Sequence, residues 1–317
     1  MVILRKQGSY LKIENKKVKK LIECMAMLLI LMVMPIRHVQ AASSIKGFDI
    51  SSKNGIVDWE AVAKNGMDFV MLRTGEGKAP DKDTQYDAYY DGAKALGHNV
   101  GAYHVCCVRT PAEAVKEAKY CLEILDGREL DYPLAYDIEK AGCFAGGKSN
   151  TTAIAKAFCK VIADAGYIPM IYSSSSYLKD YFDWSKLKGY KVWAAYYGES
   201  RPKLPVAVDI WQYTSKGSVE GANTDRGYCD LNYSYMEAIS VKFVKNSITM
   251  KKGTTTVAKV KLNPSGCTDT LKFSSSNKSI VTVGSSTGKL QAKKKGKAVI
   301  TVKTGSGKKA KIKVTEK

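Results

Sequence analysis

Residues 132–140, YPLAYDIEK, form a short apolar run that ends in two carboxylates, Asp137 and Glu139. The run from Leu134 to Ile138 has the length and composition of a buried strand. Side chains two apart on a strand leave the same face, so we expect the two carboxylates about 6 to 7 Å apart. Two acids that close do not ionise independently, and one is expected to keep its proton near neutral pH. The pair therefore predicts acid–base chemistry, although a surface strand with two solvated acids would show the same pattern.

Around this run, residues 43–240 alternate short apolar segments with helical ones, which predicts parallel β-α units. Thr110 followed by Pro111 is typical of a helix start. The connections shorten after residue 172, so eight strands with about five helices predict an α/β barrel that lacks helices near its end. The expected strands are 45–50, 69–73, 100–105, 134–138, 168–172, 192–196, 207–212 and 227–231, and the expected helices are 58–65, 84–96, 111–125, 151–165 and 175–181.

Polar and aromatic residues recur at the ends of these expected strands, where a parallel barrel carries its catalytic side chains. Each of them alone could be a turn or capping residue. Together they predict a sugar-binding cleft, because aromatic rings stack on pyranose rings while carboxylates and amides bind hydroxyls. The residues are Asp49, Arg73, Tyr103, Asp137, Glu139, Trp193, Gln212 and Asp230.

Seven segments, in this order and spacing, resemble glycoside hydrolase family 25, the lysozymes of the Chalaropsis type. They are GFDIS (47–51), FVMLRTGEG (69–77), GAYH (101–104), YPLAYDIE (132–139), VWAAYY (192–197), DIWQYT (209–214) and YCDLNY (228–233). The resemblance covers residues 46 to about 234. It implies an irregular TIM-like barrel of five β-α units plus three strands. It also implies hydrolysis of the β-1,4 bond between N-acetylmuramic acid and N-acetylglucosamine in peptidoglycan, without a cofactor.

The resemblance also assigns roles to individual residues. Glu139 matches the general acid, Asp137 its partner, and Asp49 and Asp230 the outer acids. The expected substrate-binding residues are Tyr103, Gln212, Arg73, Trp193 and Tyr172. For the second step, Asp137 could orient the substrate's own N-acetyl group or an activated water could attack. We favour the N-acetyl group, because a D-x-E strand and an N-acetylated substrate supply both parts.

The formal net charge of +20 is concentrated at the two ends of the chain. Residues 1–42 hold 8 basic and 2 acidic side chains, residues 43–240 hold 23 and 26, and residues 241–317 hold 19 and 2. The central segment is therefore slightly acidic. The basic tail lacks Trp and Tyr for base stacking, so we expect no nucleic-acid partner.

The first 42 residues have the pattern of an export signal. A basic stretch precedes an apolar run from Leu21 to Ile36, and Ala41 and Ala42 follow as cleavage candidates. A permanent anchor is the alternative, but the run is shorter than the roughly 20 residues that span a bilayer. We therefore expect a secreted, cell-wall-associated protein without a stable membrane anchor.

Residues 241–317 form a second segment, rich in Lys, Ser, Thr, Val and Gly. Short alternating runs separated by turn residues predict a small antiparallel β-sandwich. Residues 271–302 resemble the bacterial immunoglobulin-like group 2 repeat. The expected strands are 257–262, 279–283, 298–302 and 310–314. Its lysines predict either attraction to anionic wall polymers such as teichoic acids, or only a soluble surface.

The cysteines leave two possibilities open. Six of the seven beyond residue 42 fall in the central segment, so up to three disulfides are possible, and buried free thiols are equally possible. The spacing lacks C-x-x-C pairs, so we expect no metal site.

From these patterns together we expect a secreted lysozyme. The alternatives are an enzyme for chitin-like polymers and a non-catalytic glycan-binding wall protein or adhesin.

Overall fold

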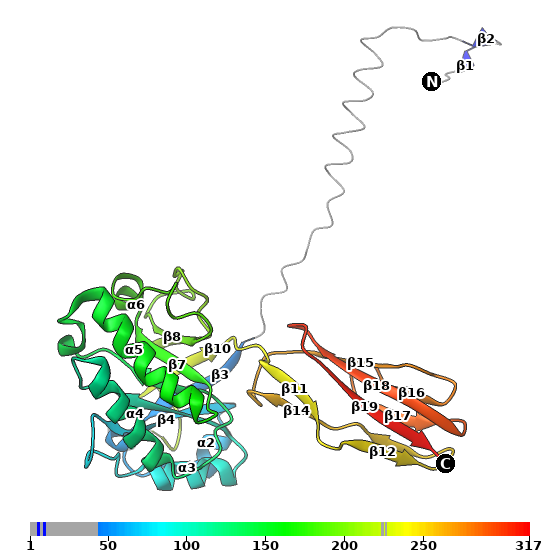
Figure 1. Ribbon diagram of the computed structural model, residues 1–317, viewed down its shortest axis with the longest axis horizontal. Coiled ribbons are helices and arrows are strands. Elements are labelled where there is room, and N and C mark those ends of the chain that lie inside the picture. The colour runs from blue at the N-terminus through cyan, green and yellow to red at the C-terminus, as the bar shows by residue number, and fades with distance from the viewer. Residues whose placement is uncertain (1–4, 7–8, 11–43, 223–224, 226) are drawn as a thin grey trace. The chain divides into compact units, whose positions relative to one another are not determined.

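The structure, a computed structural model, describes residues 5–6, 9–10, 44–222, 225 and 227–317 (Figure 1). The expected export signal lies outside the described residues, apart from β1 (Arg5–Lys6) and β2 (Ser9–Tyr10), which pair antiparallel. Residues 43–317 form one compact unit that contains a closed barrel and a group of smaller sheets. None of the helices in the described part of the chain is long and apolar enough to span a bilayer.

Eight strands close the barrel in the order β10-β3-β4-β5-β6-β7-β8-β9. They are β3 (Ile45–Ile50), β4 (Phe69–Glu76), β5 (Asn99–Val105), β6 (Leu134–Asp137), β7 (Pro169–Ser174), β8 (Lys191–Ala195), β9 (Ile210–Gly217) and β10 (Cys229–Ser234). Neighbours from β3 to β9 are parallel. The predicted α/β barrel with eight strands is confirmed.

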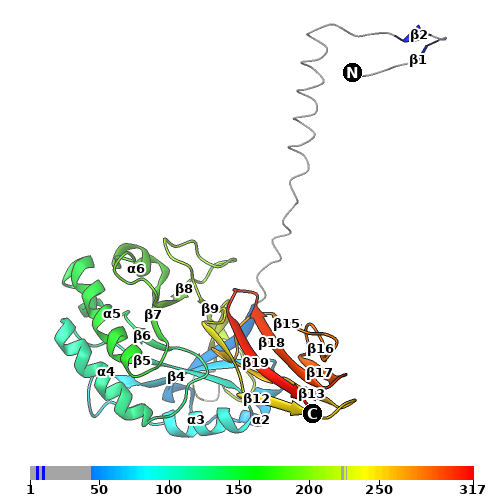
Figure 2. The ribbon, with the colours of Figure 1, turned by 45° about the vertical axis from the view of Figure 1, so that its right-hand side comes forward.

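Helices follow the first strands and cover the outside of the barrel. They are η1 (Ser52–Asn54), α2 (Trp59–Ala63), α3 (Tyr86–Ala95), α4 (Pro111–Leu125), η2 (Ala141–Phe144), α5 (Gly147–Asp164) and α6 (Ser175–Asp180). The long helices α4 and α5 lie side by side (Figures 1 and 2). The bounds of α4 are those expected, because Thr110 caps the helix with Glu113 in a capping box and Pro111 takes the first helical position. Helix α5 begins at Gly147, earlier than expected.

Strand alternation separates two layers of side chains. On β6, Leu134 and Tyr136 pack outward among the helices, whereas Ala135 packs inside the barrel. Asp137 therefore follows Ala135 on the inner face at the strand end. The barrel interior is tightly filled where β3 pairs with β4: Gly47 lies opposite Phe69, and a Cβ atom on Gly47 would lie 2.4 Å from the Phe69 ring. Only glycine fits at that position.

Two details differ from the expected parallel barrel. Strand β10 is antiparallel to both β9 and β3, so Asp230 lies near its start rather than its end. Strand β6 ends at Asp137, so Glu139 lies beyond the strand, and strand alternation does not set its direction. The face still collects both acids, because an antiparallel strand brings its start to the edge where the parallel strands end.

Residues 240–316 form the second β-rich region. Its strands are β11 (Ser240–Phe243), β12 (Ser247–Met250), β13 (Thr255–Val257), β14 (Val260–Asn263), β15 (Leu271–Ser275), β16 (Val281–Val283), β17 (Lys289–Ala292), β18 (Gly296–Thr304) and β19 (Lys309–Glu316). They form sheets β12-β19-β18-β15, β13-β17-β16 and β11-β14. The expected single strand 257–262 is wrong, because β13 ends at Val257 and β14 begins at Val260 in another sheet. Strand β12 pairs parallel with β19, so the region is not wholly antiparallel.

Candidate active site

A cleft of about 460 Å³ opens where the parallel strands of the barrel end. All nine residues that the sequence predicted for the site line it. The full lining is Asp49, Ser51, Lys53, Arg73, Glu76, Tyr103, Val105, Asp137, Glu139, Lys140, Tyr172, Trp193, Gln212, Tyr228 and Asp230. Five carboxylates, the four predicted acids and Glu76, therefore line one cavity, which suits proton transfer at a polar substrate.

Asp49 and Asp230 sit opposite each other on β3 and β10, since the register pairs the two residues directly. Asp49 is 5% exposed, and its Oδ2 accepts hydrogen bonds from Gln212 Nε2 at 3.0 Å and Asn232 Nδ2 at 2.8 Å. These two amides have their donors committed to one carboxylate. The arrangement fixes the Asp49 carboxyl group, shielded from solvent, at the floor of the cleft.

Asp137 and Glu139 differ in their surroundings. Asp137 is 4% exposed, whereas Glu139 is exposed on the cleft rim. Burial, then the charges of Glu139 and Asp49, raises the pKa of Asp137 well above its usual value. Burial and then the charge of Asp230 raise the pKa of Glu139. The ionisation of each acid depends on that of the other. Glu139, on the exposed rim, is the carboxyl that can pass a proton to a bound substrate.

One oxygen of Asp137, Oδ1, is buried and has no hydrogen-bond partner among the described residues. A buried acceptor without a donor carries a desolvation penalty of about 1 to 3 kcal/mol. A ligand N–H or O–H that reaches the cleft floor would remove that penalty. Asp137 is thus placed to accept a hydrogen bond from a bound molecule.

Aromatic side chains form one wall of the cleft. The ring of Trp193 lies 4.5 Å from that of Tyr172 and 5.9 Å from that of Tyr103, centroid to centroid. Trp193 is only 1% exposed, and its Nε1 donates to Asn232 Oδ1 at 2.8 Å. Burial therefore leaves Trp193 no open face for the sugar stacking expected of it. Tyr228, which is 37% exposed on the same cleft, has such a face.

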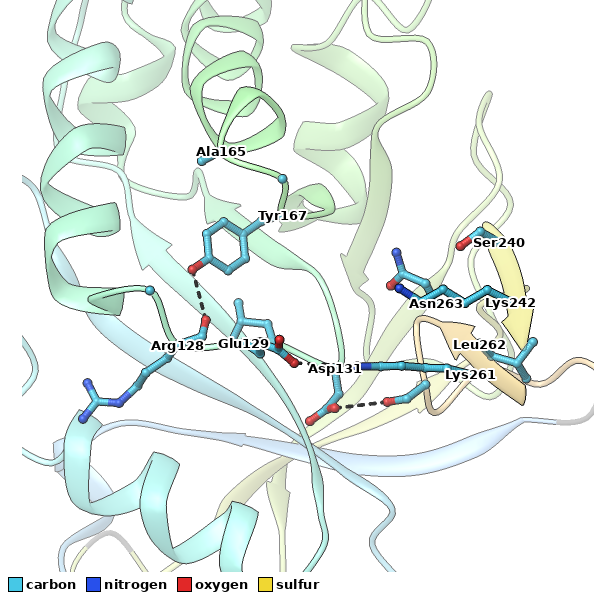
Figure 3. Close-up of a pocket in the computed structure, with 14 residues that line it drawn as sticks. Arg128, Glu129, Asp131, Ala165, Tyr167, Ser240, Lys242, Lys261, Leu262 and Asn263 are labelled. Atoms are coloured by element: carbon cyan, nitrogen blue, oxygen red, sulfur yellow. Dashed lines mark hydrogen bonds and ion pairs between the residues drawn. The ribbon is translucent and has the colours of Figure 1, made fainter. Parts of the chain in front are cut away.

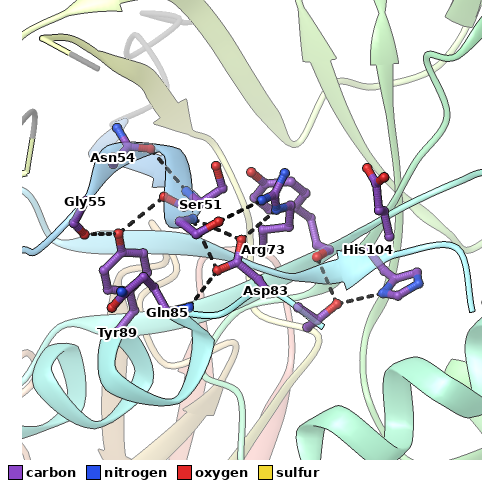
Figure 4. A network of polar contacts seen from close by, with 12 residues as sticks. Ser51, Asn54, Gly55, Arg73, Asp83, Gln85, Tyr89 and His104 are labelled. Atoms are coloured by element: carbon purple, nitrogen blue, oxygen red, sulfur yellow. Dashed lines mark hydrogen bonds and ion pairs between the residues drawn. The ribbon is translucent and has the colours of Figure 1, made fainter. Parts of the chain in front are cut away.

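A buried carboxylate holds Arg73 in place (Figure 4). Asp83 Oδ2 accepts from Arg73 Nε at 2.7 Å, and the Asp83 side chain is 0% exposed. The same carboxylate accepts from the backbone N–H groups of Ser52 at 2.9 Å and Gln85 at 2.9 Å. Arg73 also donates to Ser52 Oγ at 3.0 Å. The guanidinium is therefore oriented before any ligand arrives.

His104, next to Tyr103 on β5, has a structural environment. Its Nδ1 lies 2.8 Å from Thr74 Oγ1, and its Nε2 lies 2.8 Å from the Gly77 carbonyl oxygen. Burial lowers its pKa to about 4, so the ring is neutral near pH 7. A neutral ring with both nitrogens occupied supports the end of β4 and takes no part in proton transfer.

The family description of glycosyl hydrolases family 25 matches residues 48–222, more than half of the chain. The chain belongs to glycosyl hydrolases family 25. The description of the bacterial Ig-like domain (group 2) matches residues 237–314. The family 25 match ends before β10, whose Asp230 lines the cleft and whose Asn232 binds Asp49.

Relatives of this family 25 protein include two lysozymes and an endolysin. The autolytic lysozyme of Clostridium acetobutylicum is 30% identical over 197 residues, covering 62% of this chain and 57% of that protein. Lysozyme M1 of Streptomyces globisporus is 28% identical over 196 residues, covering 58% of this chain and 66% of that protein. The crystal structure of the CTP1L endolysin matches with a TM-score of 0.55 and 28% identity, covering 66% of this chain and 74% of that chain. The chain thus spans 57% of the length of the autolytic lysozyme.

Several cleft residues of this family 25 protein were missed by sequence reasoning. Lys53, Glu76, Lys140 and Tyr228 line the cleft, and Asn232 binds Asp49. Asn232 and Tyr228 lie in the YCDLNY segment, so the alternation around Asp230 could have identified Asn232. Lys53, in the 3-10 helix after β3, and Lys140, just beyond Glu139, carry no strand pattern that would have marked them.

A second hollow of similar size, about 440 Å³, is lined by residues 127–131, 165–167, 240, 242, 261–263 and 265 (Figure 3). Its polar contacts include Lys261 Nζ to Glu129 Oε2 at 3.6 Å and Ser265 Oγ donating to Asp131 Oδ1 at 3.3 Å. It lacks the facing acids at strand ends that define the cleft.

Within the residues that the structure describes, no group of three or more His, Cys, Asp or Glu side chains is arranged to hold a metal ion.

Proposed function

We propose that this chain is a secreted lysozyme that hydrolyses the β-1,4 bond between N-acetylmuramic acid and N-acetylglucosamine in peptidoglycan. Membership of glycosyl hydrolases family 25 and similarity to two lysozymes support the substrate class. The observation that carries the proposal is the pairing of a buried Asp137 with an accessible Glu139, both with raised pKa, in one cleft. A binding protein has no need of a protonated carboxyl at that position.

Glu139 is the proposed general acid. The upward shift of its pKa favours the protonated carboxyl, which gives its proton to the glycosidic oxygen as the bond to the anomeric carbon breaks. Asp49 and Asp230 remain as the outer acids of the cleft. The charge of Asp230 helps to keep the proton on Glu139.

Asp137 is the proposed assistant. Its buried Oδ1, without a partner among the described residues, is suited to accept a hydrogen bond from the acetamide N–H of the substrate. That hydrogen bond would orient the acetamide so that its oxygen attacks the anomeric carbon as the glycosidic bond breaks. Water would later open the five-membered ring that this attack closes. This route retains the anomeric configuration. Inversion, seen by NMR of the first product, would contradict it.

Arg73, Tyr103, Tyr172 and Gln212 are the proposed substrate ligands. Gln212 Oε1 already accepts hydrogen bonds from the hydroxyl of Tyr172 at 3.0 Å and that of Tyr197 at 3.0 Å. Gln212 and Tyr172 therefore form a prearranged hydrogen-bonding wall beside Asp49. We assign sugar stacking to Tyr228 in place of Trp193, because Tyr228 is 37% exposed on the cleft whereas Trp193 is 1% exposed.

Replacing Glu139 with Gln tests the assignment. We expect kcat on purified peptidoglycan to fall by roughly 10²- to 10⁴-fold, because the amide has no acidic proton to give. Glu113→Gln is the matched control, since Gln also serves at that helix-capping position. Mass spectrometry should find new reducing ends on muramic acid. Undiminished lysis by Glu139→Gln would refute the assignment, and glycan binding without reducing ends would favour the adhesin alternative.

For residues 241–317 we propose attraction to anionic wall polymers. All 19 lysines of this segment are exposed. Lys303 on β18 lies between Lys272 on β15 and Lys309 on β19, directly opposite each in the register. Like charges placed opposite one another repel, so a bound polyanion would relieve a cost that the free sheet carries.

Salt dependence tests this second proposal. Binding of the full chain to purified walls should weaken as salt rises from about 0.05 to 0.5 M, because screening shortens the reach of the lysine charges. Walls stripped of teichoic acid should bind less. We expect a triple variant, with Gln in place of Lys272, Lys303 and Lys309, to bind intact walls and stripped walls almost equally. Binding that ignores salt would contradict the proposal.

A further inference from the structure

Two buried cysteines lie beside the segment that carries the catalytic acids. Cys106 directly follows β5, and Cys143 lies in η2. Their sulfur atoms are 3.2 Å apart, and the side chains are free thiols in residues exposed by only 0% and 1%. A disulfide bond is about 2.0 Å long, so a closing movement of roughly 1.2 Å would join them.

The pair brackets the segment that contains Glu139. The backbone N–H of Cys106 donates to the Asp137 carbonyl oxygen at 2.8 Å, and that of Cys143 donates to the Lys140 carbonyl oxygen at 2.9 Å. The Cys143 thiol also lies 3.4 Å from the Cys106 carbonyl oxygen, to which it donates. A covalent link here would tie the two ends of residues 137–143 to the end of β5.

We propose that Cys106 and Cys143 form a disulfide bond in the exported protein, and that this bond fixes the Glu139 segment against β5. The inference rests on the export proposed above, because oxidising surroundings preserve disulfides. It does not depend on which glycan the enzyme cleaves.

The chemistry requires an oxidant of the disulfide class, such as a thiol–disulfide oxidoreductase or a small disulfide. A thiolate of one cysteine attacks the oxidant's disulfide and releases one thiol, and the second cysteine then attacks the mixed disulfide and releases the other. Two protein thiols are oxidised, one disulfide is reduced to two thiols, and both protons end on those thiols. Contact with Cys106 lowers the pKa of Cys143, which favours Cys143 as the first thiolate.

Other cysteines have different surroundings. The Cys107 sulfur accepts a hydrogen bond from Lys140 Nζ at 3.0 Å on the exposed side of the segment. The buried Cys121 sulfur lies 3.6 Å from Thr74 Oγ1, and the buried Cys159 sulfur lies 3.9 Å from the Met170 carbonyl oxygen. These contacts make Cys107 and Cys159 suitable control positions.

Peptide mapping of the full chain tests the bond. The chain is reduced in denaturant, refolded with oxidised glutathione, then denatured, alkylated without reductant and cut with trypsin. Peptides 95–109 and 141–148 should appear linked, with a mass about 2 Da below their sum. Recovery of both peptides with every cysteine alkylated would overturn the proposal.

Variants identify the partner, because peptide 95–109 contains both Cys106 and Cys107. Cys107→Ser and Cys159→Ser should keep the link, and Cys106→Ser should lose it. A link that persists in Cys106→Ser would assign the bond to Cys107 and overturn the proposal. Mapping of the unmodified chain decides the question even if a variant fails to fold.

Thermal unfolding gives an independent readout of what the bond does. The oxidised chain should melt roughly 5 to 10 °C above the reduced chain, because the bond closes a loop of about 37 residues in the unfolded state. Cys143→Ser should melt at one temperature in both conditions, whereas Cys159→Ser should keep the difference. Equal melting of oxidised and reduced unmodified chain would show that the bond does not fix the segment. Neither measurement uses hydrolytic activity, so failure here is distinct from failure of the proposed function.

Discussion

Replacement of Asp83 with Asn should cost this barrel more stability than the loss of any exposed ion pair. The Asp83 carboxylate is fully buried and accepts from Arg73, whose side chain is 16% exposed, and from two backbone N–H groups. A hydrogen bond to a charged group contributes about 1.5 to 3 kcal/mol, and Asn keeps the shape but loses the charge. The Arg73 charge is then left without its partner, which adds to the loss. We expect a destabilisation of about 3 kcal/mol, or roughly 5 to 10 °C in Tm.

Urea unfolding followed by tryptophan fluorescence measures this loss in the barrel alone, because all four tryptophans lie between residues 43 and 240. Asp87→Asn is the matched control. Asp87 also carries two ion pairs, to Lys82 at 2.5 Å and Arg128 at 2.7 Å, but its side chain is 48% exposed. Solvent screens such pairs, so the control should lose less than about 1 kcal/mol. An Asp83→Asn variant within about 1 kcal/mol of the unmodified protein, or a control that loses as much, would refute the argument.

Three further changes test the cleft and the barrel floor. Burial raises the pKa of Asp137 in the folded protein, so ionisation of Asp137 opposes folding at any pH above 3.8, its pKa in the unfolded chain. Asp137→Asn should therefore abolish hydrolysis yet raise Tm near pH 7. Calorimetry should show no gain in Tm near pH 3, where the carboxyl is protonated in both states. Burial and then the charge of Asp230 raise the pKa of Glu139, so Asp230→Asn should move the alkaline limb of the kcat/KM profile to lower pH. An alkaline limb at unchanged pH would show that a group other than Glu139 sets it. Gly47→Ala should cost about 1 to 3 kcal/mol in urea unfolding, since its Cβ would meet the Phe69 ring, and an unchanged midpoint would show that the ring can move.

Local patterns predicted most of the barrel and its cleft. Alternation along β6 places Asp137 on the inner face, and the same period places Asp49, Tyr172 and Gln212 there. Thr110 followed by Pro111 predicted the start of α4 to the residue. These features were readable because they depend on neighbours within four positions along the chain.

Other parts of the site depend on contacts distant in sequence. The antiparallel direction of β10 brings Asp230 opposite Asp49, and no local pattern encodes the direction in which a closing strand runs. The packing around Trp193 was equally hidden, since its burial follows from neighbours on other strands.

The sequence by itself determined that acids, amides and aromatic rings recur at strand ends, and it thereby determined which chemical groups line the cleft. Only the tertiary structure decided how that chemistry is divided: a buried Asp137, an exposed Glu139, an Arg73 held by Asp83, and a Cys106 thiol beside Cys143. The physical reason is that side-chain type and alternation are local properties. Burial, charge proximity and sulfur–sulfur distance are set by chain segments that meet only when the barrel closes.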